Sequence, residues 1–264
     1  MTIRSPLAKL LCNYDPDTFE QPAVALRLEV EQNNMELPVH CHRKGQLVLA
    51  LSGGVTCEVP KAMWMVPPQH AVWIPGGMPH SNRATDNAQI SFLFVEPGAA
   101  HMPGECCTLA ISPLVRELIQ FLADQIQTYP QNGATARLVG VLLEQLVAAP
   151  VKQLHLPVSD HPKIRRIIEA LEADTADRTT LAQWAQRLAM SDRSLARLVQ
   201  QETGLTFGRW RKQLHLIVAL RQLASGMSVQ QVAGNLGYDS VTAFITMFKK
   251  ALGRPPSQYF SDFR

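Results

Sequence analysis

The chain has 264 residues, of which 46% are hydrophobic and 18% charged, and its 25 Lys and Arg exceed its 22 Asp and Glu by three. This composition excludes an intrinsically disordered chain, because such chains have too few hydrophobic side chains to form a core. At about 100 to 200 residues per domain, the length predicts one large domain or two ordinary ones. No run approaches the roughly 18 consecutive apolar residues of a membrane helix, so we expect a cytoplasmic protein with no membrane partner.

The charge is distributed unevenly along the chain. Residues 1–158 contain 10 Lys and Arg against 13 Asp and Glu, whereas residues 159–264 contain 15 against 9. A basic half beside a mildly acidic half is the asymmetry that indicates nucleic-acid binding in one part of a chain. Charge alone is equally typical of a solvated surface, so the motifs have to distinguish the two.

Short runs rich in Val, Ile, Leu and aromatic residues follow one another between residues 23 and 96, separated by Gly and Pro. Many short strands with such turns predict a small β-barrel or sandwich. The five cysteines have no framework spacing, so we expect reduced thiols rather than disulfides: Cys12, Cys41, Cys57, Cys106 and Cys107.

The pattern becomes helical after residue 103. Apolar residues recur at helical spacing behind Ser112 and Pro113, and a second amphipathic stretch spans residues 136–149. We expect two helices that pack on the strands or pair with a second copy of the chain. Residues 151–162 contain two prolines and no periodicity, which predicts a linker.

The C-terminal half contains an approximate internal repeat at an offset of 48 residues. Each unit opens with a hydroxyl residue followed three positions later by Gln, at Thr180 and again at Ser228, which is a capping-box signature. A short turn and a second helix follow in both units, so we predict helix-turn-helix units at about residues 181–202 and 229–252. The helix expected between them, residues 207–224, would span roughly 27 Å, close to the ~34 Å repeat of the major groove.

The second helix of each unit divides into a buried stripe and an opposite face. An arginine on that face can bind guanine through two hydrogen bonds, whereas Ala, Ile and Thr can contact the thymine methyl group. We therefore predict that these faces read double-stranded DNA. The candidate DNA-contacting residues are Arg193, Ala196, Arg197 and Gln200 in the first helix and Thr242, Ile245, Thr246 and Lys249 in the second.

Residues 163–260 resemble the AraC/XylS family of bacterial transcription regulators. The most specific part of the resemblance runs from Gly237-Tyr-Asp-Ser240 through Phe244 and Phe248-Lys-Lys250 to Gly253 and Pro255-Pro256-Ser-Gln-Tyr259. The family often carries an Arg where this chain has Thr246, so we expect the first recognition helix to be the stronger reader. The resemblance implies promoter DNA as a partner, a homodimer, and contact with RNA polymerase if the protein is an activator rather than a repressor.

Three histidines of the N-terminal half form a candidate metal site. His40 and His42 project from the same face of a strand because side chains alternate, and His80 follows a turn. The spacing of these residues, with Gln46 nearby, resembles the cupin superfamily, in which a Glu stands where this chain has Gln46. The resemblance implies that His40, His42, Gln46 and His80 hold a divalent Zn, Ni, Fe or Mn ion. A metal-free polar rim of an effector pocket and purely structural histidines are the alternatives.

Met and Trp are concentrated in the same half, which is typical of a barrel core and also of an apolar effector pocket. Trp64, Trp73 and Met78 are our candidates for lining such a pocket, and the effector would be a small organic molecule.

These observations predict an α+β multidomain protein. Residues 1–150 would form a cupin-like β-barrel with a helical dimerisation segment, residues 151–162 a linker, and residues 163–264 an all-α domain with tandem helix-turn-helix units. We expect a sequence-specific, effector-responsive transcription regulator and not an enzyme. A metal-dependent sensor, or a cupin metalloenzyme fused to a DNA-binding module, are the alternatives.

Overall fold

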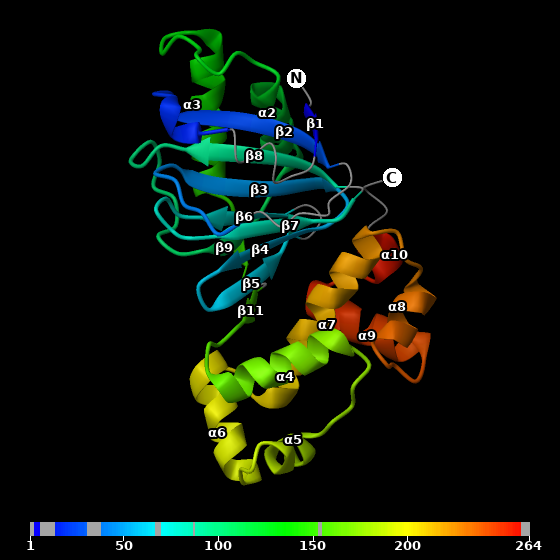
Figure 1. Ribbon diagram of the computed structural model, residues 1–264. Helices are drawn as coiled ribbons and strands as arrows, with labels where there is room; N and C mark the ends of the chain where they lie inside the picture. The colour runs from blue at the N-terminus through cyan, green and yellow to red at the C-terminus, as the bar shows by residue number, and fades with distance from the viewer. Residues whose placement is uncertain are drawn as a thin grey trace. The chain divides into compact units, whose positions relative to one another are not determined.

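The computed structural model describes residues 3–5, 14–30, 38–66, 70–86, 88–152 and 155–259. The chain forms two compact units, Met1–Val59 with Trp64–Leu154, and Pro60–Met63 with His155–Arg264. The first unit is rich in strands and the second in helices (Figure 1). The predicted division into a strand-rich N-terminal part and a helical C-terminal part is therefore confirmed.

The strands form two sheets. The larger sheet contains, in spatial order, β1 (Ile3–Ser5), β2 (Ala23–Val30), β8 (Gln89–Val95), β3 (Gly45–Ser52), β6 (His70–Ile74), β9 (Cys107–Ala110) and β10 (Val151–Lys152). The smaller sheet contains β11 (His155–Pro157), β5 (Ala62–Met65), β4 (Val55–Val59) and β7 (Ser81–Ala84). A 3-10 turn, η1 (Pro16–Thr18), precedes β2.

The central strands of the larger sheet are buried on both faces, which explains their nearly continuous apolar sequences. Alternate residues of β3, represented by Leu47 and Leu49, pack on one face with Leu93 and Val95 of β8. This face is covered by α2 (Pro113–Ala123) and α3 (Ala134–Val147). The Ser112 hydroxyl accepts a hydrogen bond from the Val115 amide and caps α2, as the sequence predicted.

The two sheets do not close into a barrel, so the expectation of a closed β-barrel is wrong. His40 and His80 exchange backbone hydrogen bonds of 2.9 and 2.8 Å, but they form an isolated bridge. The next hydrogen-bonded pair of an antiparallel ladder would join residues 38 and 82. Because Pro38 has no N–H to donate, one of the two hydrogen bonds of that pair cannot form.

Apart from β11 and the start of β5, the elements of the second unit are helices. They are α4 (Pro162–Ala173), α5 (Leu181–Arg187), α6 (Asp192–Thr203), α7 (Phe207–Ala224), α8 (Val229–Asn235), α9 (Val241–Leu252) and α10 (Pro256–Tyr259). Complete capping boxes begin α5 and α8, at Thr180 with Gln183 and at Ser228 with Gln231. Gly204 and Gly253 end α6 and α9 with left-handed φ angles of 71° and 81°, a conformation that glycine adopts without strain.

Helix α7 is the centre of this unit. It carries buried residues around most of its circumference, among them Trp210, Leu214 and Ile217. The Trp210 indole donates a 2.9 Å hydrogen bond to the Pro157 carbonyl, and Gln213 donates to the His155 carbonyl, so α7 also holds β11. No helix among the described residues has the length and apolar character needed to cross a lipid bilayer.

Candidate nucleic-acid interface and histidine site

Helix α6 has the two faces that a DNA-reading helix requires. Leu195 and Val199 are 0% and 1% exposed and anchor the helix in the unit. Arg193 and Arg197 are exposed, one turn apart on the opposite side, with Ala196 half-buried between them. Gln200 is exposed as well, but its side-chain amide donates a 2.8 Å hydrogen bond to the Gly204 carbonyl at the end of the helix.

Helix α9 repeats this arrangement with a less polar face. Phe244 and Phe248 are both 0% exposed. The candidate DNA-contacting residues lie on the other side, where Thr242, Thr246 and Lys249 are exposed and Ile245 is half-buried. The Thr246 hydroxyl donates a 2.8 Å hydrogen bond to the Thr242 carbonyl, which leaves its methyl group available for apolar contact.

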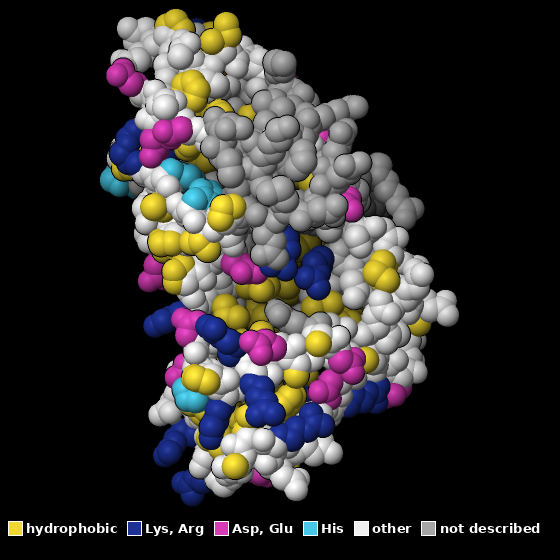
Figure 2. Space-filling view, viewed as in Figure 1, with side chains coloured by type: hydrophobic (Ala, Val, Ile, Leu, Met, Phe, Trp, Pro, Cys, Tyr) yellow, Lys and Arg dark blue, Asp and Glu magenta, His cyan; other side chains and the backbone are white. Residues whose placement is uncertain are grey.

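Basic side chains accumulate around the first helix-turn-helix unit. Figure 2 shows Lys and Arg side chains clustered over the surface formed by α4, α5 and α6. The exposed arginines on these helices are Arg165, Arg166, Arg187, Arg193 and Arg197. A positive surface around a recognition helix attracts the phosphate backbone of DNA and positions the helix in its groove.

The structure brings the three predicted histidines of the first unit together. His40 and His42 lie just before β3 and His80 just before β7, and one ring nitrogen of each lies within 4.8 Å of those of the other two. Gln46 on β3 joins them, because its Oε1 lies 3.0 Å from His42 Nε2 and 3.4 Å from His80 Nε2. His80 and Gln46 are each 1% exposed. We call these four residues the histidine site.

Backbone carbonyls fix the orientation of all three imidazoles. The Nδ1 atoms of His40, His42 and His80 lie 3.0, 2.5 and 2.8 Å from the carbonyl oxygens of Pro38, Lys44 and Met78. A carbonyl only accepts, so each Nδ1 carries the hydrogen and each neutral imidazole keeps its lone pair on Nε2. Burial lowers the pKa of His80 to about 4 and also lowers the pKa of His40, which keeps both rings neutral at pH 7. Neutral imidazoles with converging lone pairs have the chemistry of a metal site.

Comparison with known proteins identifies the family. Residues 184–262 match the model of a helix-turn-helix domain. The chain is 54% identical over 251 residues to the HTH-type transcriptional regulator NimR of Escherichia coli, which covers 95% of this chain and 92% of that protein. It is also 28% identical over 135 residues to the arabinose operon regulatory protein of Escherichia coli, covering 48% of this chain and 46% of that protein.

The chain belongs to the AraC family of helix-turn-helix transcription regulators. The expectations of a DNA-binding transcription regulator, and of a protein that is not an enzyme, are thereby confirmed. The structure of ToxT from Vibrio cholerae covers 90% of this chain and 96% of its own, with a TM-score of 0.38 and 10% identity.

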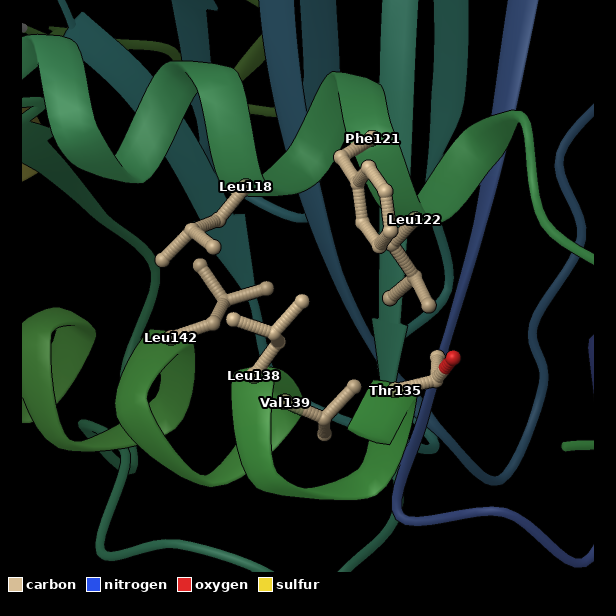
Figure 3. A pocket seen from close by; sticks show the side chains of 7 residues that line it. All are labelled: Leu118, Phe121, Leu122, Thr135, Leu138, Val139 and Leu142. Carbon is tan, nitrogen blue, oxygen red and sulfur yellow. The ribbon is translucent and has the colours of Figure 1, made fainter. Parts of the chain in front are cut away.

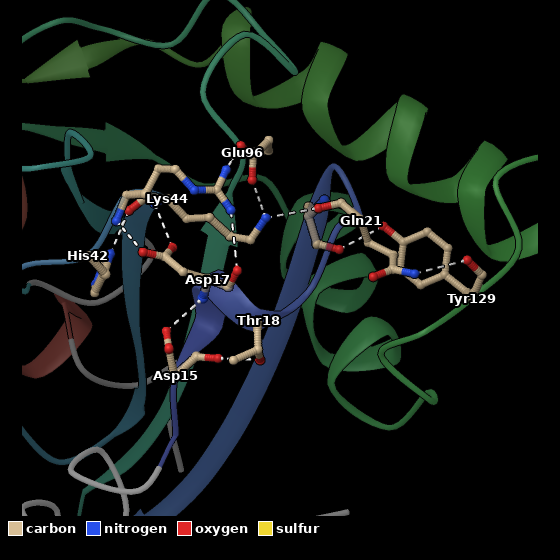
Figure 4. Close-up of polar contacts among 10 residues, drawn as sticks. Asp15, Asp17, Thr18, Gln21, His42, Lys44, Glu96 and Tyr129 are labelled. Carbon is tan, nitrogen blue, oxygen red and sulfur yellow. Dashed lines mark hydrogen bonds and ion pairs between the residues drawn. The ribbon is translucent and has the colours of Figure 1, made fainter.

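The histidine site of this AraC-family regulator is supported by an ion network that the sequence analysis missed (Figure 4). The Asp17 carboxylate accepts hydrogen bonds of 2.5 and 3.0 Å from the backbone amides of Arg43 and Lys44, immediately after His42. The Lys44 side chain is 0% exposed and is paired with Glu96, and it also donates to the Gln21 carbonyl at 3.2 Å. These contacts hold the backbone between His42 and Gln46 in place.

Of the three residues predicted to line an effector pocket, Trp73 lies on the face of its sheet opposite to the histidine site. Trp73 is 4% exposed and packs in the core under α2 and α3, with its indole donating a 2.8 Å hydrogen bond to the Pro103 carbonyl. Gln46 precedes Leu47, the register partner of Trp73, so Gln46 and Trp73 point to opposite faces of the sheet. Trp64 is buried on β5, and Met78 is half-buried with its sulfur 3.1 Å from that of Cys106.

The described cysteines, Cys41, Cys57, Cys106 and Cys107, are all free thiols, and Cys12 lies outside the described residues. Burial raises the pKa of the Cys106 thiol to about 12 and that of Cys107 to about 11. Both remain protonated at neutral pH, so neither is an activated nucleophile.

An apolar groove lies between α2 and α3 (Figure 3). Its lining residues carry no charge: Leu118, Phe121, Leu122, Thr135, Leu138, Val139 and Leu142. Leu114 and Phe121 on α2 are 52% and 43% exposed, and Leu138 and Val141 on α3 are 37% and 43% exposed. Single exposed apolar residues are ordinary, but a continuous set on two adjacent helices indicates an interaction surface.

Proposed function

We propose that this regulator binds promoter DNA by placing α6 and α9 in successive major-groove segments. The observation that carries the proposal is the repeated arrangement of a capped helix, a turn and a second helix whose outer face is exposed and contains Arg193, Arg197 and Lys249. The buried helix α7 joins the two helix-turn-helix units, and its 18 residues span roughly 27 Å. This length is comparable to, though shorter than, the ~34 Å between major-groove segments on one side of a duplex.

The DNA proposal is tested with duplexes recovered from a random-sequence library by selection on the full chain. Hydroxyl-radical footprinting should then show two protected segments about one helical turn apart. The Lys249→Ala variant should weaken binding by a similar factor on all sequences and reduce the slope of log Kd against log salt by about one. A single protected segment would contradict reading by both helices.

We propose further that the histidine site binds a divalent transition metal through the Nε2 atoms of His40, His42 and His80, with Gln46 Oε1 as an additional ligand. Atoms bound to one ion lie at most about 4.2 Å apart for ligand distances near 2.1 Å. The present separations, up to 4.8 Å, are close to that limit. An amide in place of a carboxylate favours metals that prefer imidazole, such as Ni, Zn or Fe, over Mg or Ca. A three-histidine set leaves positions free for a small effector with an oxygen or nitrogen donor.

The metal proposal has a specific alternative in the same residues. The Nε2 of Gln46 has no hydrogen-bond partner among the described residues. Rotating the amide by 180° would direct its two N–H groups at the lone pairs of His42 and His80 and satisfy the site without an ion. Calorimetric titration of the full chain with NiCl2 and ZnCl2 distinguishes the two. The proposal predicts one site per chain that His80→Ala abolishes and His101→Ala retains, whereas a titration without heat from either metal supports the rotated amide.

We also propose that a second copy of the chain covers the apolar groove. The face is self-complementary in chemistry, and two-fold homodimers are the commonest oligomers. Leu114, Leu118 and Phe121 follow one side of α2 at spacings of four and three residues, as in the seam of a coiled coil. In sedimentation analysis the wild-type chain should be a dimer and the Phe121→Glu variant a monomer. Phe207→Glu on α7 is not a suitable control, because the Phe207 ring contacts Arg211. The matched control is Val39→Glu, an exposed apolar residue outside the groove. A wild-type monomer would contradict the proposal.

In this scheme the strand-rich N-terminal unit senses a small effector or the metal itself, and the helical C-terminal unit binds promoter DNA. Contact with RNA polymerase applies if the regulator is an activator. Coupling between the units is then a difference in DNA affinity between the effector-bound and effector-free states, measured by titrating the selected duplex with and without the ligand.

A further inference from the structure

In the helical part of the chain, a loop connects the two helix-turn-helix units independently of α7. Residues 174–180 join α4 to α5, and we call them the bracing loop. The bracing loop ends at Thr180, which caps α5, the first helix of the first helix-turn-helix unit. Residues 236–240 form the turn between α8 and α9 of the second helix-turn-helix unit, directly after Asn235, the last residue of α8. The bracing loop contacts this turn, although about 60 residues separate the two in sequence.

Three contacts make this connection. The Thr175 hydroxyl donates a 2.8 Å hydrogen bond to the Asn235 carbonyl. The Arg178 guanidinium donates to the Gly237 carbonyl and to the Asp239 carboxylate, the latter at 2.9 Å. The pairing of Arg178 with Asp239 lowers the pKa of the Asp239 carboxyl group, so the ion pair is formed at neutral pH.

The close approach of the two backbones explains why the turn contains a glycine. Gly237 has a φ angle of 69°, and a Cβ atom at this position would lie 3.0 Å from the Ala176 carbonyl oxygen. Any other residue would be strained in its own backbone and would press on the bracing loop. The turn is therefore shaped to receive the loop.

The other end of the bracing loop is attached to α7. The Thr179 carbonyl accepts a hydrogen bond from Arg211, whose guanidinium lies 4.9 Å from the centre of the Phe207 ring. Thr179 is 7% exposed, and its amide donates a 2.6 Å hydrogen bond to Asp177. The bracing loop thus contacts the first helix-turn-helix unit, α7 and the second helix-turn-helix unit.

We propose that the bracing loop, through Thr175 and Arg178, fixes the orientation of α9 relative to α6 and so sets the separation of the two DNA segments that the regulator accepts. The proposal rests on the reading of DNA by both helices. A single connection through α7 would let one helix-turn-helix unit bend or twist against the other, whereas a second attachment through the bracing loop restricts that movement. Arg178 is in this sense a positioning residue, which acts on DNA spacing rather than on bases.

One inserted base pair between the two segments distinguishes a braced reader from a flexible one. The insertion moves one segment by about 3.4 Å and rotates it by about 35°. A rigid pair of helices cannot follow this rotation, so one helix loses its base contacts. A flexible pair of helices follows part of the rotation and loses fewer base contacts.

The experiment measures Kd for the selected duplex and for the same duplex lengthened by one base pair between its protected segments, using the full chain. We expect the wild type to bind the lengthened duplex at least about tenfold more weakly, the loss of one or more base contacts. In Thr175→Ala/Arg178→Ala the ratio of the two Kd values should fall to about threefold or less. Asp239→Asn, which removes the same ion pair from the other side, should lower the ratio in the same direction.

The matched control is Arg221→Ala. Arg221 is an exposed arginine near the end of α7, and its loss removes the same charge without touching the bracing loop. This variant should keep the wild-type ratio. A wild-type ratio in Thr175→Ala/Arg178→Ala, with affinity reduced equally on both duplexes, would mean that Arg178 contacts phosphate and would overturn the proposal. A footprint with one segment would instead contradict the reading of DNA by both helices.

Discussion

Replacing Asn82 by leucine is expected to stabilise the sheet-rich unit. Asn82 lies on β7, two residues after His80, and is 1% exposed. Neither its amide nitrogen nor its amide oxygen has a hydrogen-bond partner in the described part of the chain. A buried polar group without a partner costs about 1 to 3 kcal/mol, and leucine has the same number of side-chain heavy atoms and the same branching at Cγ without polar atoms. The free energy of unfolding should therefore increase by about 1 to 3 kcal/mol.

Urea denaturation of the full chain, followed by circular dichroism, measures this change through the midpoint of the transition at constant slope. The matched control is Asn132→Leu at an exposed position, which should change stability by less than about 0.5 kcal/mol. A loss of stability in Asn82→Leu would refute the reasoning, because it would show that the amide is hydrogen-bonded in the native protein, to water or to a ligand.

Three further predictions concern packing, pH and capping. Gly45→Ala should lower the melting temperature by an amount corresponding to about 1 to 3 kcal/mol, because its Cβ would lie 2.1 Å from the Trp73 ring; an unchanged value would mean that the indole can move freely. Burial lowers the pKa of His215 to about 4, so the unfolded state binds more protons and stability should fall by about 3 kcal/mol between pH 6.5 and 4. His215→Phe should remove much of this dependence in denaturation curves, and an identical pH profile would contradict it. Ser228→Ala removes the cap of α8 and should cost about 1 kcal/mol, whereas exposed Ser225→Ala, outside the capping box, should cost less in the same assay.

Local sequence patterns were sufficient to predict the helical unit. Its capping boxes, terminal glycines and apolar stripes each depend on residues within one or two turns, so Thr180, Ser228 and Gly253 were interpretable without knowledge of the fold. The pair His40 and His42 was interpretable for a similar reason, because side chains two apart share a face of an extended segment.

Features that depend on contacts between distant segments could not be predicted. Closure of the barrel depends on pairing between strands far apart in sequence, and the isolated bridge of His40 with His80 is the part of that pairing that forms here. The buried ion pair of Lys44 with Glu96 joins residues 52 positions apart, and its sequence signal is indistinguishable from that of two surface charges. The bracing loop has no motif of its own, although Gly237 in the turn it contacts was part of the recognised pattern.

The central claim is that α6 reads bases through Arg193 and Arg197, and selection from a random-sequence library tests it most directly. The full chain and the variants Arg193→Ala and Arg197→Ala are each used to select duplexes, and the base preferences at every position are compared. The account predicts that each variant loses its preference at a different position within the same segment and binds the wild-type duplex more weakly by about 1 to 3 kcal/mol. Wild-type affinity and unchanged preferences in both variants would contradict it.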